Sequence, residues 1–406
     1  MVRDPSAMEP MLPGRDGDPE DLADLALALV AASAQAAGRL HPITEATLRD
    51  LLRTINSYYS NLIEGHRTHP IDIERAMRAD YAAEPARRAL QLESRAHIEV
   101  QDAITQRLAA EPGLKVCSPE FLCWLHERFY AGLPPALLTV EGPPGTAPET
   151  LVPGRLRERL VEVGRHLPPA ADELPRFLKR FAEVYAPERH RGQARLIAAA
   201  ASHHRLAWIH PFLDGNGRIA RLFTDAYLAA GGIKGHGLWS ASRGLARRRA
   251  EYLDRLAAAD AQRRGDPDGR DYLTLAGLPD FCRFFLATCI DQARYMGELL
   301  RTDEIERRIA AYVQLRAAGT LPGPPLKPVS APVLLAVFLR GALPRGEAAA
   351  LTGYGERAGR AVLAALLEEG LLVCDSAKGP VRLGLPMAAV PYLFPGVFPG
   401  VFPAAG

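Results

Sequence analysis

The spacing of apolar residues along the chain predicts a mainly helical protein. From residue 21 to about Leu108, and again from Glu173 to about Tyr295, apolar positions recur three and four residues apart, as on the buried face of a helix. A new helix can begin at Pro70, because proline is favoured in the first helical turn. A stretch rich in proline and glycine, 132–153, lies between the two helical regions and is predicted to be a loop.

Strand patterns are short and occur in two places. Residues 160–166, which end before two prolines, alternate like a strand and predict a β-hairpin arm. From Val329 onward, three short helical patterns precede two strand-like pieces, 371–374 and 381–385. This order of elements is typical of a winged helix. The expected fold class is therefore mainly α with a β-hairpin, followed by a C-terminal winged-helix (α+β) domain.

Both ends of the chain lack a helical or strand period. Residues 1–18 are rich in proline, glycine and aspartate, and we expect a disordered leader. A proline-rich linker at 321–327 precedes the last domain. Residues 388–406 contain a small repeat of phenylalanine, proline, glycine and valine, and we expect a low-complexity tail without assignable chemistry.

Composition and charge narrow the classes of function. The 406 residues carry 49 Lys and Arg against 47 Asp and Glu, a net charge of +2, which demands neither nucleic acid nor an anionic membrane as a partner. No apolar run approaches the ~18–20 residues that span a bilayer. Five cysteines without a C-x-x-C spacing predict reduced thiols and no zinc site. We expect a cytoplasmic protein that does not engage a membrane.

Groups used in phosphoryl and nucleotidyl transfer gather in one segment, HPFLDGNGRIAR, at residues 210–221. Its glycine turn before a helix N-terminus predicts a nest of backbone N–H groups for anions. Asp214 at the mouth of the nest can hold Mg²⁺ beside phosphate. His210 titrates near neutrality and can accept a proton from a nucleophile. With Arg218 and Arg221 on the first helical turn, the segment predicts phosphoryl or nucleotidyl transfer.

The segment resembles the HPFx[D/E]GNGRxxR signature of the Fic (Fido) family, without a departure. Enzymes of that family mostly transfer AMP from ATP to a Ser, Thr or Tyr hydroxyl of a protein, with Mg²⁺. The resemblance implies that His210 deprotonates the acceptor hydroxyl, that Phe212 packs in the core and that Asp214 holds the metal. It implies nucleotide binding by the remaining positions, namely Gly215, Asn216 and Gly217 at the α- and β-phosphates, Arg218 at phosphate, Arg221 at the γ-phosphate, and the adjoining Ile219 and Ala220.

A second resemblance lies far upstream, in the sequence SNLIEG at residues 60–65. It is similar to the family's inhibitory motif, [S/T]xxxE[G/N], whose glutamate pairs with the second arginine of the signature. Glu64 would then face Arg221, with Ser60 and Gly65 completing the motif. A carboxylate in the γ-phosphate position neutralises that arginine and leaves ATP misaligned for in-line attack.

Two further resemblances concern residues that would contact the substrates. Residues 153–169 resemble the family's flap, which covers the site and registers the target's backbone by strand addition. Tyr252 resembles the aromatic residue beside the adenine, and Asp260 stands where the family often has Asn, while Leu253 stands where a second Tyr is common. Nucleotide contacts in the flap are expected from Val161, Glu162, Val163 and Gly164.

The resemblance covers roughly residues 20–295, and the whole chain is expected to have six parts. These are a leader (1–18), an N-terminal helical region with the inhibitory helix (19–110), a Fic catalytic core (111–300), a helix and linker (301–328), a winged-helix-like domain (329–387) and a tail (388–406).

The function we expect is a protein adenylyltransferase that Glu64 inhibits through Arg221. Removal of AMP from a protein, or transfer from another nucleotide donor, stays open at the same site. From a different class, a winged-helix DNA-binding regulator with a nucleotide-sensing Fic core stays open, because Arg357 and Arg360 lie on the presumed recognition helix. Glutamates accompany these arginines, which favours protein docking or dimerisation over DNA binding for this module. Expected partners are ATP and a protein substrate docked on the flap; self-modification, a homodimer and DNA are further options.

Overall fold

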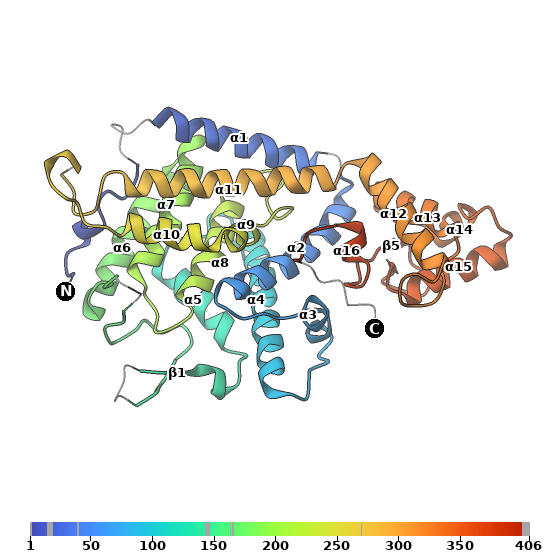
Figure 1. The fold of residues 1–406 in the computed structure, drawn as a ribbon, viewed down its shortest axis with the longest axis horizontal. Helices are drawn as coiled ribbons and strands as arrows, with labels where there is room; N and C mark the ends of the chain where they lie inside the picture. The colour runs from blue at the N-terminus through green and yellow to red at the C-terminus, as the bar shows by residue number, and fades with distance from the viewer. Residues whose placement is uncertain are drawn as a thin grey trace.

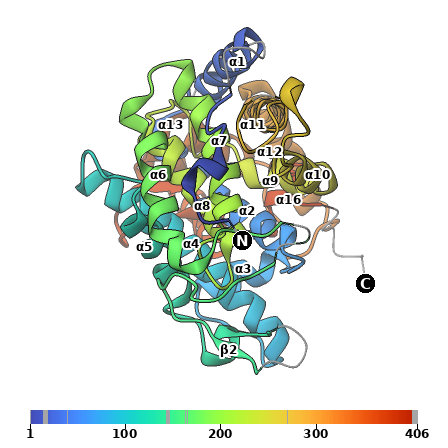
Figure 2. The same cartoon turned by 90° about the vertical axis from the view of Figure 1, so that its left-hand side faces the viewer.

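The protein is described by a computed structural model covering residues 2–13, 19–38, 40–142, 147–162, 164, 166–268 and 270–399. Within them the chain is mainly helical with small antiparallel sheets (Figures 1 and 2), as the predicted fold class requires. The α-helices are α1 (Pro19–Ala37), α2 (Pro42–Ile63), α3 (Pro70–Met77), α4 (Pro85–Ala110), α5 (Pro119–Tyr130), α6 (Leu174–Tyr185), α7 (Gln193–Ile209), α8 (Asn216–Ala230), α9 (Ala241–Arg247), α10 (Arg249–Ala259), α11 (Gly277–Leu299), α12 (Thr302–Ala317), α13 (Ser330–Arg340), α14 (Arg345–Ala350), α15 (Glu356–Glu368) and α16 (Val390–Leu393).

Short elements complete the described residues. The strands are β1 (Thr139–Val140), β2 (Glu149–Thr150), β3 (Ala342–Leu343), β4 (Leu372–Val373) and β5 (Val381–Leu383), and the 3-10 helices are η1 (Pro5–Met8), η2 (Pro135–Leu138), η3 (Ala171–Glu173), η4 (Pro187–Arg189) and η5 (Asp266–Asp268).

Proline and capping side chains set where several helices begin. α3 begins at Pro70, as predicted, and α5 begins at Pro119 after Ser118. The Ser118 Oγ accepts the backbone N–H of Phe121 at 3.2 Å. Both devices suit a helix start, because proline lacks the N–H that the first turn leaves unpaired and serine satisfies another such donor.

Helices α7 and α8 lie at the centre of the helical region. α7 is buried on nearly every side, and its polar residues His203, His204 and Arg205 are fully buried. Helices α2, α4, α5, α6 and α11 pack around this pair, and α1 runs along α11 (Figure 1). The loop that joins α7 to α8 is therefore held between two firmly packed helices.

The part of the chain from α13 to β5 is an α+β unit. Its sheet has the order β3-β5-β4 with antiparallel pairs. β4 and β5 lie within the two predicted strand pieces, whereas β3 was not predicted, because two residues give no readable alternation. The unit contacts α2 through Thr44, whose Oγ1 donates to the carbonyl of Phe338 at 2.6 Å. Its assignment as a winged helix stays a prediction.

The prediction of a disordered leader is wrong for residues 2–13. Asp4 caps η1 by accepting the N–H of Ser6, and Met8 and Met11 are buried in the core. The composition of this segment indicated disorder, but its methionines pack against helices that are distant in sequence. The rest of the predicted leader, 14–18, lies outside the described residues.

The predicted hairpin arm differs from the hairpin in the structure. β1 pairs antiparallel with β2, upstream of the predicted strand 160–166. Among the described residues of 153–169, only His166 takes part in a β-bridge. Gly164 explains part of the difference, because it takes a turn conformation with φ 61° in the middle of the predicted strand.

The low-complexity tail packs against the helical region as far as residue 399. Phe394, Val397 and Phe398 are buried. The Phe398 ring contacts Tyr58 of α2 edge-on, with centroids 5.2 Å apart, and the Tyr59 hydroxyl donates to the carbonyl of Val397 at 2.9 Å. The tail is thus part of the packing around α2.

Replacing Phe394 with alanine should release the tail. The side chain is fully buried, and emptying such a site costs about 3–5 kcal/mol. Loss of ~3 kcal/mol of local stability corresponds to roughly hundredfold faster amide exchange at residues 392–398, measured by mass spectrometry. Leu351→Ala, at an exposed leucine, is the control. Unchanged exchange in Phe394→Ala would show that the tail is held by other contacts.

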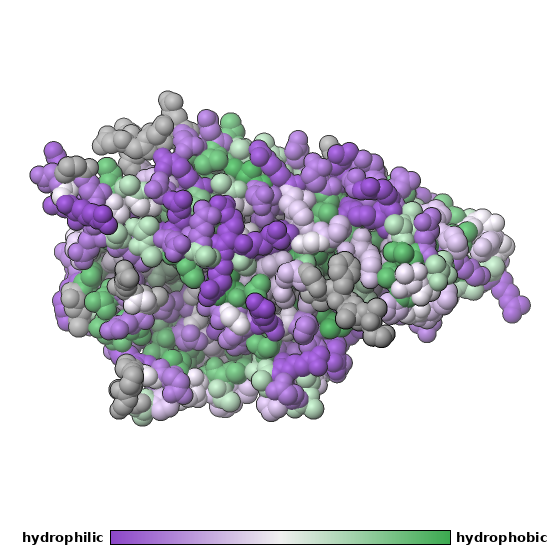
Figure 3. Space-filling model, in the orientation of Figure 1, coloured by the Kyte–Doolittle hydropathy of each residue, from purple (hydrophilic) through white to green (hydrophobic). Residues whose placement is uncertain are grey.

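The surface and the helix lengths test the prediction that no segment of the chain spans a membrane. Figure 3 shows hydrophilic and hydrophobic residues interspersed over one face of the molecule. Among the described residues, no single helix is long and apolar enough to cross a bilayer. Only the stretches 21–37 and 42–63 taken together reach that length and composition, and they are bent by 117° to each other.

Candidate active site

The loop between α7 and α8 carries the predicted chemistry. α7 ends at Ile209, and His210 takes a left-handed backbone conformation with φ 49° and ψ 62°. Gly215 ends the loop with φ 76°. Only glycine fits at position 215, because an added Cβ would lie 2.5 Å from the hydroxyl of Tyr130.

The N-terminus of α8 opens onto this loop. The first hydrogen bond within α8 runs from the N–H of Ile219 to the carbonyl of Gly215 at 2.9 Å, so the N–H groups before Ile219 lie at the unpaired, positive end of the helix. The Asn216 side chain braces the loop by bonding both the N–H and the carbonyl of Phe212, at 2.9 and 2.8 Å. Phe212 is fully buried, as expected, and stacks on His126 with centroids 4.1 Å apart.

The side chains of two residues that were expected to contact the nucleotide are directed into the core instead. The side chains of Ile219 and Ala220 are each 1% exposed and belong to the hydrophobic core. Ile219 and Ala220 stand between Arg218 and Arg221 in the sequence, and their burial in the core helps to hold α8 in place. The side chain of Asn216 is likewise taken up by the loop backbone.

His210 is partly buried beside the nest. Removal from water lowers the pKa of its imidazole to about 4, and the nearby Arg157 acts in the same direction. At neutral pH the ring is therefore uncharged, which is the form that can accept a proton.

Asp214 is the carboxylate at the mouth of the nest. Its side chain is 48% exposed, and Oδ2 accepts the hydroxyl of Tyr130 at 2.9 Å. Burial raises the pKa of Tyr130, so the hydroxyl stays protonated and remains a donor. No cluster of three or more metal-ligating side chains occurs among the described residues. A single, oriented carboxylate suits Mg²⁺, which binds through one or two carboxylates together with waters and phosphate oxygens.

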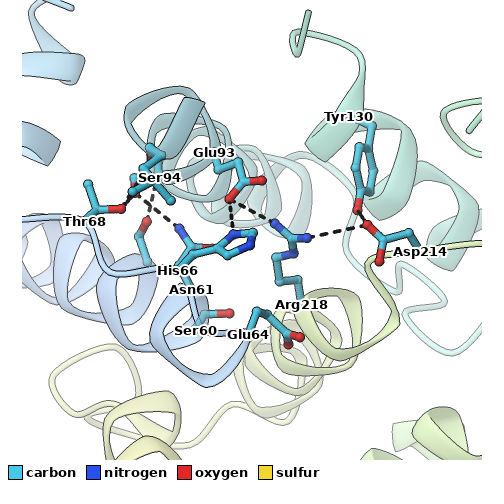
Figure 4. A network of polar contacts seen from close by, with 12 residues as sticks. Ser60, Asn61, Glu64, His66, Thr68, Glu93, Ser94, Tyr130, Asp214 and Arg218 are labelled. Atoms are coloured by element: carbon cyan, nitrogen blue, oxygen red, sulfur yellow. Dashed lines mark hydrogen bonds and ion pairs between the residues drawn. The ribbon is translucent and has the colours of Figure 1, made fainter. Parts of the chain in front are cut away.

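Arg218 is almost fully buried between two carboxylates (Figure 4). Its Nη1 lies 3.3 Å from Glu93 Oε2 and its Nη2 lies 3.7 Å from Asp214 Oδ2. The same oxygen of Glu93 contacts Nδ1 of His66 at 2.6 Å, a contact that raises the pKa of His66. Burial disfavours the charge on Arg218, but the nearby carboxylates of Glu93 and Asp214 raise its pKa, so the guanidinium is charged.

The structure brings the predicted pair of Glu64 and Arg221 together. Arg221 Nη2 lies 2.5 Å from Glu64 Oε1, and Arg221 also donates to the Ser60 hydroxyl at 2.9 Å and the Ser60 carbonyl at 3.0 Å. Burial alone would raise the pKa of Glu64, but Arg221 outweighs it and lowers the pKa. Gly65, with φ 91°, turns the chain away after α2.

Glu64 enters the nest itself. A Cβ added to Gly217 would lie 2.5 Å from Glu64 Oε1. The carboxylate therefore occupies space directly over the N-terminal turn of α8, where an anion would bind.

The family comparison supports the interpretation of this region. Residues 116–228 match the Fic/DOC family. This part of the chain is a Fic/DOC-family domain.

Relatives of the Fic domain share a limited stretch of sequence. A protein adenylyltransferase Fic of Nematostella vectensis is 39% identical over 80 residues, which are 20% of this chain and 19% of that protein. The protein adenylyltransferase Fic of Drosophila ananassae is 37% identical over 79 residues, 20% of this chain and 16% of that protein. The match thus spans less than a fifth of these curated relatives.

A solved structure extends the likeness of the fold beyond the Fic domain. The crystal structure of a Fic family protein from Desulfovibrio desulfuricans G20 aligns over 88% of this chain and 95% of that chain, with 20% sequence identity and a TM-score of 0.50. This likeness concerns the fold.

The residues predicted to contact adenine, or to contact the nucleotide from segment 153–169, differ in their burial and in the contacts that they make. Tyr252 is 3% exposed and its hydroxyl bonds His203 at 2.8 Å, while Asp260 lies 3.1 Å from His204. In segment 153–169, Val161 is partly buried and Glu162 and Gly164 are exposed. Val163 lies outside the described residues. Their roles toward a nucleotide stay predictions.

The sequence did not predict two side chains that contact the site, Glu93 of α4 and Tyr130 of α5. Neither lies in a motif, and each reaches the nest only through the packing of its helix. No signal in the sequence marks either residue, because a single charged or aromatic residue does not reveal how its helix packs.

Proposed function

We propose that this protein is a protein adenylyltransferase that moves AMP from ATP to a protein hydroxyl, with Glu64 holding the activity low. The observation that carries the proposal is the arrangement of one loop. A neutral imidazole, an oriented carboxylate and a positive helix end adjoin each other between α7 and α8, with Arg218 and Arg221 buried beside them.

In the proposed reaction His210 accepts the proton of a Ser, Thr or Tyr hydroxyl. The hydroxyl oxygen forms a bond to the α-phosphorus of ATP, and the bond from that phosphorus to the bridging oxygen of the β-phosphate breaks. The products are AMP-protein and pyrophosphate, and the proton leaves His210 to solvent. The helix N-terminus and Arg218 would bind the phosphates and stabilise the charge that develops on them.

Asp214 would hold Mg²⁺ in this site. The ion, when bound, offsets the negative charge of the phosphates. The contribution of the chain is to orient the carboxylate, which Tyr130 does through its hydroxyl.

Glu64 would inhibit by occupying the γ-phosphate position. Its carboxylate pairs with Arg221 and stands over Gly217. ATP then lacks its γ-phosphate partner and binds in a pose that is not aligned for attack at the α-phosphorus.

The test uses ATP labelled at the α- or the γ-phosphate, with Mg²⁺, the Glu64→Gly variant and cell lysate as a source of acceptor protein. Adenylyl transfer predicts label on protein from α-labelled ATP and none from γ-labelled ATP. Label from the γ position would indicate phosphoryl transfer instead. Absence of both labels would contradict AMP transfer.

The alternatives have separate readouts. Release of AMP from a previously labelled protein by the wild-type chain would identify removal of AMP as the activity, and label from another nucleotide would identify a different donor. A DNA-binding regulator should bind DNA in a salt-dependent way that survives His210→Ala.

Replacing Tyr130 with phenylalanine should weaken Mg²⁺ binding. The change removes the donor to Asp214 Oδ2 and leaves the carboxylate free to turn. Loss of such an outer contact typically costs about tenfold or more in metal affinity. A Mg²⁺ titration of ATP binding in the Glu64→Gly background measures it. An unshifted titration would show that Asp214 is oriented without Tyr130.

A further inference from the structure

Arg157, in the segment that precedes α6, is a buried cation. The residue is 3% exposed, and no carboxylate of the described residues pairs with it. Burial lowers the pKa of its guanidinium to about 10. A buried charge is costly unless hydrogen bonds compensate it, so its contacts show what holds it there.

The side chain of Arg157 contacts backbone carbonyls of the loop after α7 and of its own segment, 153–169. Nε donates to the carbonyl of His210 at 2.8 Å. Nη1 donates to the carbonyl of Arg159 at 2.9 Å, within segment 153–169, and Nη2 donates to the carbonyl of Pro169 at 2.6 Å, at the end of that segment. In addition, the backbone N–H of Arg157 donates to the carbonyl of Pro211 at 3.0 Å.

The carbonyl of His210 needs such a contact. His210 has φ 49°, a left-handed conformation that is unfavourable for a residue with a side chain and persists only where the surroundings hold it. Its carbonyl also lies at the C-terminal, negative end of α7, where a cation is favourable. The guanidinium of Arg157 supplies both the hydrogen bond and the charge.

We propose that Arg157 is a positioning residue that acts through His210, fixing the imidazole relative to segment 153–169. The inference rests on the proposed function, in which His210 takes the proton, and on the expectation from the sequence that segment 153–169 docks the acceptor protein. Arg157 makes none of the phosphate contacts, which come from the nest and from Arg218 and Arg221. It should therefore affect the chemical step and leave nucleotide binding alone.

The test compares Arg157→Gln and Arg157→Lys with the parent Glu64→Gly protein. In Arg157→Gln the single-turnover rate of AMP transfer should fall by about a hundredfold, because small misplacements of a catalytic group have effects of that size. The dissociation constant for ATP should stay within about threefold. Arg157→Lys should recover part of the rate, since it restores the charge but not the planar fork that reaches three carbonyls. Arg176→Gln, at an exposed arginine of α6 paired with Glu173, is the matched control.

A merely structural role would lower the yield or the melting temperature of Arg157→Gln and leave the rate per folded molecule unchanged. That result, or a loss of ATP affinity equal to the loss of rate, would overturn the proposal.

Amide hydrogen exchange provides a readout that needs no activity. In Arg157→Gln, exchange should be faster in both 155–170 and 206–212, and in the control it should be unchanged. If the parent Glu64→Gly protein transfers no AMP, the proposed function fails. The exchange measurement still tests whether Arg157 links segment 153–169 to the loop at His210. Unchanged exchange in both segments would refute the link between them.

Discussion

Replacing His210 with alanine should reduce AMP transfer by at least about a hundredfold, because positioned general bases contribute factors of about 10²–10⁴. The expectation follows from the state of the imidazole. Burial lowers its pKa to about 4, so the ring is uncharged at neutral pH and able to accept the proton of the attacking hydroxyl. The measurement is label transfer from α-labelled ATP in the Glu64→Gly background.

The same pKa fixes how the rate should depend on pH. A base works only when deprotonated, so transfer should rise with pH through about 4 and then be level across the neutral range, as far as His210 is concerned. An unperturbed histidine would instead place this rise near ~6.5.

Controls separate loss of chemistry from loss of structure. ATP should bind His210→Ala within about threefold of the parent, because the phosphate contacts come from α8 and its N-terminus. His69→Ala, which removes an exposed imidazole at the start of α3, should transfer normally. Transfer that persists in His210→Ala would remove this residue from the role of base.

The sequence predicted the parts of the site that are contiguous in the chain. The loop from His210 to Arg221 is one local structure, in which a helix end, a glycine turn and a helix start set the geometry over a few residues. Its chemistry can therefore be inferred without knowing the rest of the fold. The pairing of Glu64 with Arg221 was predicted from a resemblance, because nothing local links residues that are so far apart in the sequence.

The supporting side chains could not be predicted in this way. Glu93, Tyr130 and Arg157 reach the loop from a helix, another helix and an irregular segment. The place of each of these side chains depends on how its element packs. A single charged or aromatic residue in the sequence does not reveal that packing. Such residues become visible only when their burial and their partners are seen.

The errors in the fold have the same origin. The leader and the tail both lack periodicity, yet Met8 and Phe394 are fully buried. Periodicity reports an element that buries one face along its length, whereas an irregular segment can bury isolated side chains on a surface built by others. The predicted strand at 160–166 rested on a local alternation. Gly164 turns the chain there with φ 61°, Val163 and Arg165 lie outside the described residues, and of the others only His166 takes part in a β-bridge.

Replacing Glu64 with glycine should raise AMP transfer by about ten- to a hundredfold. The carboxylate is bound to Arg221 at 2.5 Å, and a hydrogen bond between charged groups is worth about 1.5–3 kcal/mol. Each ~1.4 kcal/mol corresponds to a factor of ten. The lowered pKa of Glu64 keeps it ionised near neutrality, so mild acidification should not relieve the inhibition.

The effect of Glu64→Gly on nucleotide affinity should depend on the γ-phosphate. In the proposed function Arg221 is the γ-phosphate partner that Glu64 withholds, and ADP carries no γ-phosphate to bind it. Glu64→Gly should therefore tighten the binding of ATP more than the binding of ADP, which calorimetry can measure. Glu111→Gly is the matched control, because Glu111 also follows the end of a helix and pairs with an arginine, Arg107, far from the loop.

Two results would contradict this account of Glu64. Equal gains in affinity for ATP and ADP would mean that the carboxylate acts by general repulsion of anions and not by occupying Arg221. An unchanged rate with tighter ATP binding would mean that the pose of ATP is already productive beside Glu64. Arg221→Lys in the Glu64→Gly background distinguishes occupation of Arg221 from general repulsion of anions. A lysine keeps the charge but lacks the second donor that reaches Ser60. If occupation of Arg221 is the mechanism, this double variant should lose most of the gain in ATP binding over ADP.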